Sequence, residues 1–164
     1  MTVRTLTVER FSVTSVAPFE SVLARIDAAI GHPDIRTFLA ELAQTRGLED
    51  LEQLVARAIG PSGLMEFVRF DLGEVLRKER GGASPKIVRL VIGNPIIMKQ
   101  MTQHVPDAAS YAPVTILIDE RQDGVRLSYD RIGSYLLPYH SVDALKVARA
   151  LDEKIERLLV AAAA

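Results

Sequence analysis

Apolar and β-branched residues alternate with polar ones at the beginning of the chain. Residues 2–16 are rich in Thr and Val, and Phe11 and Val13 share one face, which predicts a first strand. Leu6 and Val8 have the opposite parity, so we expect a bulge between the two parts of this strand.

The following segment has a helical period. Pro18 suits the first turn of a helix that Gly31 ends, with apolar residues at helical spacing at Phe19, Val22, Leu23, Ile26 and Ile30. Residues 33–60 repeat this pattern on both sides of Gly47, which interrupts it. We therefore predict an inserted helical hairpin over residues 33–60.

The second half of the chain returns to a β-type pattern. Asp123-Gly124 is a typical turn between two strands, and a Gly81-Gly82 loop is expected after a short helix. The predicted strands cover residues 64–71, 86–92, 114–119 and 125–130. The predicted helices cover residues 72–80, residues 95–104 and a long final segment that Ser141 caps.

This order of elements predicts a single α+β domain over residues 1–164, in which an antiparallel sheet packs against helices. One sheet face is uniformly apolar in the last two strands, at Val114, Ile116, Ile118, Val125, Leu127 and Tyr129. The other face is mixed, because Thr115, Leu117, Arg126 and Ser128 are expected near Met65, Phe67 and Arg69 or Ile87, Arg89 and Val91. We expect another surface to cover part of this mixed face.

Charge and composition exclude several classes of function. The 164 residues carry 20 Lys and Arg against 21 Asp and Glu, so there is no positive field to attract nucleic acid. The chain has no cysteine, which excludes disulfides, thiolate catalysis and Cys-based metal sites. It has no secretory signal and no apolar run long enough to span a membrane, so we expect a soluble cytoplasmic protein.

Common catalytic and cofactor motifs do not occur in the sequence. There is no phosphate-binding glycine loop, zinc-protease helix or calcium loop, so we predict no cofactor. His32, His104 and His140 are far apart, and the acids of residues 119–123 are typical of a solvated turn, so we predict no metal site.

Four residues are candidates for a site, and each has a structural alternative. Asp71 ends an apolar strand before a helix, where it either caps that helix or serves a site. Asn94, before Pro95, either caps the next helix or anchors a ligand. Tyr129 is either a core tyrosine with a protein partner or a ligand contact, and His104 is the residue best suited to acid–base work with Asp71.

The sequence resembles domain-of-unknown-function family 302. The residues that carry the resemblance are Gly93-Asn94-Pro95, Met98, Pro106, Ala112-Pro113, the strand Val114 to Ile118, Asp123-Gly124 and Leu127-Ser128-Tyr129-Asp130. Phe11-Ser12-Val13, Pro18-Phe19 and Phe67 to Asp71 extend it over nearly the whole chain. Many members have His after the aspartate of the second strand, where this chain has Leu72, so an Asp-His pair is not implied here.

The resemblance implies a TATA-binding-protein-like α+β fold, often assembled as a dimer, without DNA binding. The family has no assigned activity. The inserted hairpin is either a lid or an added layer.

Two functional hypotheses follow from these observations. The first is a non-catalytic, homodimeric binding or assembly module with a pocket between sheet and helix for a small apolar molecule, in which Asp71, Asn94 and Tyr129 are polar anchors. The second is a cofactor-independent enzyme that uses carboxylate and histidine acid–base chemistry through Asp71 and His104. We favour the first hypothesis.

Overall fold

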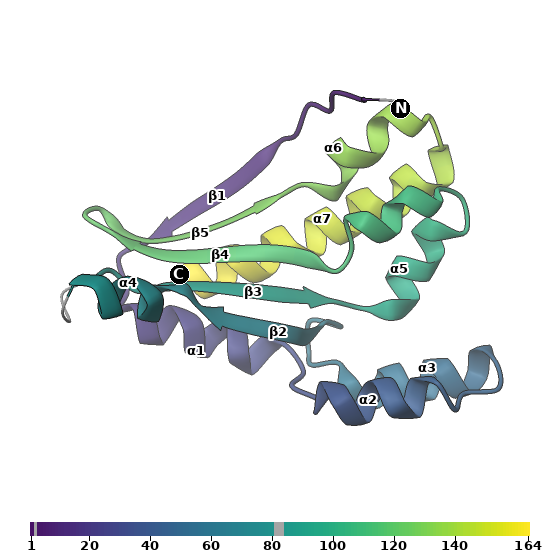
Figure 1. Cartoon of the computed structure of the whole chain (residues 1–164), viewed down its shortest axis with the longest axis horizontal. Coiled ribbons are helices and arrows are strands. Elements are labelled where there is room, and N and C mark those ends of the chain that lie inside the picture. The colour runs from purple at the N-terminus through teal and green to yellow at the C-terminus, as the bar shows by residue number, and fades with distance from the viewer. Residues whose placement is uncertain (2, 81–83) are drawn as a thin grey trace.

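The computed structural model of this chain describes residues 1, 3–80 and 84–164 (Figure 1). Within these residues the chain forms one five-stranded antiparallel sheet of order β1-β5-β4-β3-β2, together with seven α-helices and two 3₁₀ helices. The strands are β1 (Arg10–Ser15), β2 (Met65–Asp71), β3 (Ile87–Gly93), β4 (Val114–Arg121) and β5 (Gly124–Asp130). The α-helices are α1 (Phe19–Ala29), α2 (Ile35–Leu42), α3 (Leu48–Ala58), α4 (Leu72–Arg80), α5 (Pro95–Thr102), α6 (Ile132–Leu136) and α7 (Val142–Ala163), and the 3₁₀ helices are η1 (Pro106–Ser110) and η2 (Leu137–Tyr139). The α+β class is therefore confirmed.

Among the described helices, those that pack along the sheet lie on one of its faces. In Figure 1, α7 passes behind the strands and α1 lies along the same side. The inward positions of β4 and β5 alternate as the sequence predicts, since Val114, Ile116, Ile118, Val125, Leu127 and Tyr129 are all buried. They join Val22, Ile26 and Ile155 in the main core, so this sheet–helix interface is filled with side chains.

The predicted hairpin forms α2 and α3 and has a small core of its own. Phe38, Leu54, Val55 and Ala58 pack against Met65 at the start of β2. The entry and exit of the hairpin lie side by side, because the amides of Gly31 and Gly60 both donate to the carbonyl of Leu64, each at 2.9 Å. We call this crossing the neck of the hairpin.

Several boundaries differ from the prediction. The first strand begins only at Arg10, because the strand beside it, β5, ends at Asp130, with which Arg10 pairs. The bulge lies in β2, between Glu66 and Val68, and this shift turns Arg69 to the helix side of the sheet, where it contacts Asp27 of α1.

Other differences are local. The tight turn between β4 and β5 is formed by Gln122 and Asp123, and Gly124 already pairs with Arg121. The predicted Gly81-Gly82 loop lies outside the described residues. Among the helices that the structure describes, none is both long and apolar enough to cross a membrane.

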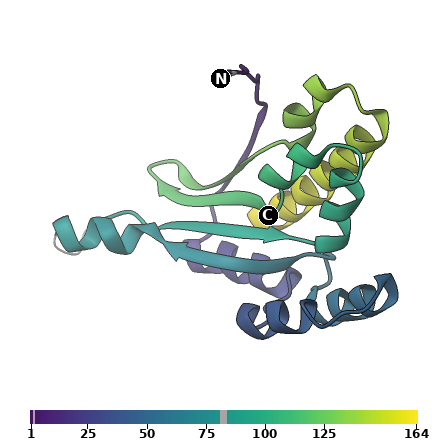
Figure 2. The ribbon, with the colours of Figure 1, turned by 45° about the vertical axis from the view of Figure 1, so that its right-hand side comes forward.

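α4 lies beyond the end of the sheet in both views (Figures 1 and 2). It follows directly after β2, an edge strand, and Leu72 and Val75 of α4 are solvent-exposed. Phe70 and Val68 of β2 are exposed as well. We call these four residues the α4 patch.

Candidate functional site

The face of the sheet that no described helix covers carries a row of side chains that crosses every strand. The register places Phe70 opposite Arg89, Arg89 opposite Leu117, Leu117 opposite Ser128, and Ser128 opposite Ser12. Outward-pointing residues on neighbouring strands lie about 5 Å apart, so this row is continuous. We call this side the open face.

A pocket of about 490 Å³ lies on the open face and is bounded at one end by η1 and α6. This volume is within the range of ordinary small-molecule sites. Its floor comes from β4 and β5, with Thr115, Leu117 and Ser128, and its walls come from Ser110, Tyr111, Pro113 and Tyr135. Arg10, Arg89 and Asp130 supply its charged groups.

Two of the three charged groups neutralise each other. Arg10 binds Asp130 with both ends of its guanidinium, since Nε donates to Oδ1 at 2.7 Å and Nη2 donates to Oδ2 at 2.9 Å. The hydroxyl of Tyr135 donates to the same carboxylate at 3.4 Å. The bonds from Arg10 hold the pKa of the Asp130 carboxyl below its ordinary value, so this group is a weak base.

Arg89 is the remaining charge. Its guanidinium carbon lies 4.6 Å from the centre of the Phe70 ring, and it forms no ion pair with any residue in the described part of the chain. Stacking on an aromatic ring holds a guanidinium by its face and leaves its N–H groups available. The charged residues that line the pocket therefore sum to a net charge of one positive unit, carried by Arg89.

An aromatic wall closes one side of the pocket. The rings of Tyr111 and Tyr135 stack with centroids 4.5 Å apart and planes 10° apart. The hydroxyls of Tyr111 and Tyr139 lie 3.1 Å apart, and this contact raises the pKa of Tyr139 to about 12. The hydrogen bond to Tyr139 and the stacking on Tyr135 hold the ring of Tyr111 in place beside the pocket.

Tyr129 has protein partners on the helix side of the sheet. Its hydroxyl donates to the main-chain oxygen of Asp152 and to the carboxylate of Glu156, each at 3.2 Å. Burial, with the nearby charges of Asp152 and Glu156, raises its pKa. This geometry is that of a core tyrosine.

The buried carboxylate of Asp152 is a structural residue that sequence reasoning missed. It accepts from the amides of Ile132 at 2.8 Å and Gly133 at 2.9 Å, and so holds α6 against α7. Burial raises its pKa. Its partners lie 20 and 19 residues earlier in the chain, a separation that no local pattern reveals.

Asn94 and Asp71 act as caps. The Asn94 side-chain oxygen accepts from the amides of Ile96 at 2.8 Å and Ile97 at 3.4 Å, and its nitrogen donates to the carbonyl of Gly63 at 3.0 Å. Asp71 accepts from the amide of Glu74 at 2.9 Å and from Arg77 at 2.7 Å, and its pKa is lowered first by the arginine.

Asp71 and His104 lie at opposite ends of the sheet. Asp71 pairs with Val88, whereas His104 follows α5, which begins after Gly93 at the far end of β3. The six residue-to-residue steps of strand from Met65 to Asp71 correspond to roughly 20 Å. His104 contacts Gln103 at 3.1 Å, and no acid–base pair forms between Asp71 and His104.

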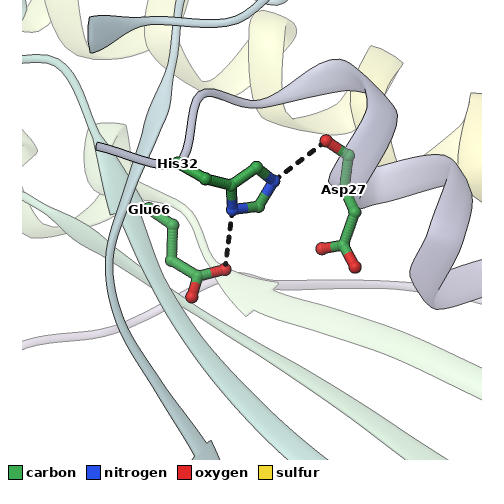
Figure 3. Close-up of side chains that lie close together, drawn as sticks. All are labelled: Asp27, His32 and Glu66. Carbon is green, nitrogen blue, oxygen red and sulfur yellow. Dashed lines mark hydrogen bonds and ion pairs between the residues drawn. The ribbon is translucent and has the colours of Figure 1, made fainter. Parts of the chain in front are cut away.

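One group of potential metal ligands combines Asp27, His32 and Glu66, as Figure 3 shows. The imidazole Nε2 donates to the main-chain oxygen of Asp27 at 3.0 Å, and Nδ1 lies 3.7 Å from a Glu66 carboxylate oxygen. Arg69 also binds both carboxylates, at 3.1 Å for its Nε to Glu66 and 3.3 Å for its Nη1 to Asp27. The guanidinium of Arg69 occupies oxygens of both carboxylates and offsets one of their two negative charges, so a cation would have to compete with it. The absence of a metal cofactor stays a prediction.

The signal for the open-face pocket in the sequence was Arg89 itself, a charged residue within the apolar run Ile87 to Ile92. Its partners Phe70 and Leu117 come from distant segments, and so do Tyr111 and Tyr135, which only the fold brings together. The pocket therefore lies on the mixed face and not between sheet and helix, where the hypothesis placed it.

Comparison with known proteins gives the family but no activity. A search of curated proteins found no match. The crystal structure of the uncharacterized conserved protein DUF302 from Bacillus stearothermophilus superimposes with a TM-score of 0.64 at 10% identity, over 93% of this chain and 97% of that one, which shows a shared fold. The sequence model described as domain of unknown function DUF302 matches residues 40–162, more than half of the chain. The chain therefore belongs to the DUF302 family.

Proposed function

We propose that this protein is a non-catalytic binding module that holds a small organic molecule in the open-face pocket. The observation that carries this proposal is a cavity of about 490 Å³ on an uncovered sheet face, with an arginine that forms no ion pair in the described chain. Binding sites typically combine an apolar lining with a few polar groups, as this pocket does.

The lining supports binding more than catalysis. Among the described residues that line the pocket there is no histidine, and the single carboxylate is held by Arg10 with a lowered pKa. A general base needs a pKa near the working pH. Ser110 and Ser128 therefore lack a base that would activate them.

For the fold, we propose the TATA-binding-protein-like arrangement. The support is a curved antiparallel sheet with one uncovered face and a long last helix, α7, on the other. Fold alone does not carry function, and the net charge of −1 argues against a nucleic acid on the open face.

As its partner we propose a second copy of the chain. The support is the α4 patch, in which Val75 is 67% exposed and Phe70 and Leu72 are exposed as well. Exposed apolar residues on an edge strand and a projecting helix are typical of protein contacts.

Ligand-observed NMR with a library of neutral, anionic and cationic fragments tests the binding proposal. Leu117→Trp fills the floor of the pocket, so we expect it to abolish fragment binding. The matched control is Val160→Trp, at an exposed position of α7, which should bind like the wild type. Fragments that bind Leu117→Trp and the wild type equally well, or a library without any binder, would overturn the proposal.

A further inference from the structure

We infer that the ligand of the open-face pocket is a flat aromatic molecule with a single carboxylate. This inference rests on the proposed function, because it concerns the same pocket. It adds the chemical class of the ligand, which the shape and size of the cavity alone do not determine.

The first argument is the charge of the pocket. Both oxygens of Asp130 are engaged by Arg10, and Tyr135 adds a third bond to that carboxylate. A ligand cation would have to displace Arg10 from a bidentate ion pair, which is the stronger class of hydrogen-bonded pair. A ligand anion displaces nothing, because the guanidinium of Arg89 forms no ion pair in the described chain.

The second argument is the geometry of Arg89. Its guanidinium carbon lies over the ring of Phe70, 4.6 Å from the ring centre, so the side chain is supported before any ligand arrives. A guanidinium presents pairs of N–H donors that match the two oxygens of a carboxylate. A supported side chain loses less conformational entropy when it binds, and this favours Arg89 as the anchor.

The third argument concerns the body of the ligand. The pocket that contains Arg89 is also lined by the stacked rings of Tyr111 and Tyr135, the ring of Pro113 and the side chain of Leu117, which pairs with Arg89 across the sheet. Flat apolar surfaces of this kind favour an aromatic ring over a flexible chain, since rings gain stacking contacts with little loss of entropy. The hydroxyl groups of Ser110, Thr115 and Ser128 also line the pocket, where they can form hydrogen bonds with polar substituents of the ligand.

The test is calorimetric titration of the whole protein with naphthalene-2-carboxylate and with its neutral analogue naphthalene-2-carboxamide. We expect the carboxylate to bind at least about tenfold more tightly, with its advantage reduced in high salt. Arg89→Gln should remove this advantage. Arg36→Gln, which removes the same charge at an exposed site on α2, should keep it.

The outcomes separate this inference from the proposed function. Equal affinity for the two probes in the wild type, or a carboxylate preference that survives in Arg89→Gln, overturns the aromatic carboxylate while a binding pocket stands. If neither probe binds but other fragments bind in a manner that Leu117→Trp abolishes, the ligand class is wrong and the pocket is right. If no fragment binds at all, both proposals fail.

Discussion

Asn94 uses both ends of its amide side chain. Its oxygen accepts from the first free amides of α5, and its nitrogen donates to the carbonyl of Gly63 in the loop before β2. The residue thus fixes the start of a helix and also ties that start to a distant loop. A cap of this kind contributes about 1 kcal/mol, and the second bond adds to it.

We expect Asn94→Ala to lower the free energy of unfolding by about 1–2 kcal/mol, because it removes both functions. Asn94→Ser provides an acceptor for the helix amides but no donor for the Gly63 carbonyl, so its stability should fall between that of Asn94→Ala and that of the wild type. Urea unfolding measures all three proteins. Asn94→Ser with the stability of the wild type would show that the bond to Gly63 contributes nothing.

The pair of Arg10 and Asp130 should make stability depend on pH. Arg10 lowers the pKa of the Asp130 carboxyl from the value of 3.8 in the unfolded chain, so the pair stabilises the fold above that pH and the effect is lost as the pH falls through the lowered pKa. At pH 7 we expect Asp130→Asn to cost about 0.5–1 kcal/mol, with solvent screening at the exposed Arg10 included.

Urea unfolding at pH 7 and in acid checks this dependence. The cost of Asp130→Asn should shrink in acid. The control is Glu41→Gln, which breaks a single contact of 3.3 Å to Arg57 on the surface and should change stability little at either pH. A cost for Asp130→Asn that is the same in acid as at pH 7 would contradict the ionic origin.

Local chemistry is readable from sequence, whereas cross-strand chemistry is not. The capping alternatives for Asn94 and Asp71 follow from their immediate neighbours, and the structure contains both caps. The setting of Arg89 depends on Phe70 and Leu117, which pair with it only in the folded sheet.

At the scale of elements, the main chains that enter and leave the α2–α3 hairpin cross closely at its neck. A β-carbon on Gly60 would lie 2.3 Å from the carbonyl carbon of Ile30, and one on Gly31 would lie 1.9 Å from the carbonyl oxygen of Ala58. These neighbours are main-chain atoms, so they cannot rotate away. Both positions therefore require glycine.

Gly60→Ala should lower the free energy of unfolding by about 2–3 kcal/mol, since the added methyl group forces the two chains of the neck apart. Gly47→Ala is the control. A β-carbon there meets nothing within 4 Å, and the cost should stay below about 1 kcal/mol, because alanine is merely a poorer N-cap. Equal unfolding midpoints in urea for the two variants would show that the neck is pliable.

The ends of several helices and strands depend on pairing or capping partners that are distant in sequence, which no local pattern identifies. The Thr- and Val-rich segment predicts a strand over residues 2–16, but β5 offers pairing partners only to Arg10–Ser15. The short α6 was missed because its amides are capped by Asp152, a residue of the last helix. The hairpin and the long α7 were found because their apolar periods are long and local.

At the scale of the whole molecule, the α4 patch predicts that two copies of the chain form a dimer. We expect light scattering at high micromolar concentration to give the mass of a dimer, and Val75→Glu to shift it to that of a monomer, because a charge replaces an apolar group in the contact. The control Leu39→Glu places the same charge on an exposed position of α2 and should leave the dimer intact. A monomeric wild type would rule out this assembly.

The alternation of inward and outward side chains along β4 and β5 affects which amino-acid substitutions this protein can accept. The side chains of Leu127 and Tyr129 face the core, while Ser128 between them faces the pocket. On β4, Ile116 faces the core and Leu117 faces the pocket. Under the proposed binding function, positions for stability and positions for recognition alternate along the same strands. Substitutions in the outward set would then change the ligand preference and leave the packed core residues in place, so new specificities could arise on this sheet by single substitutions.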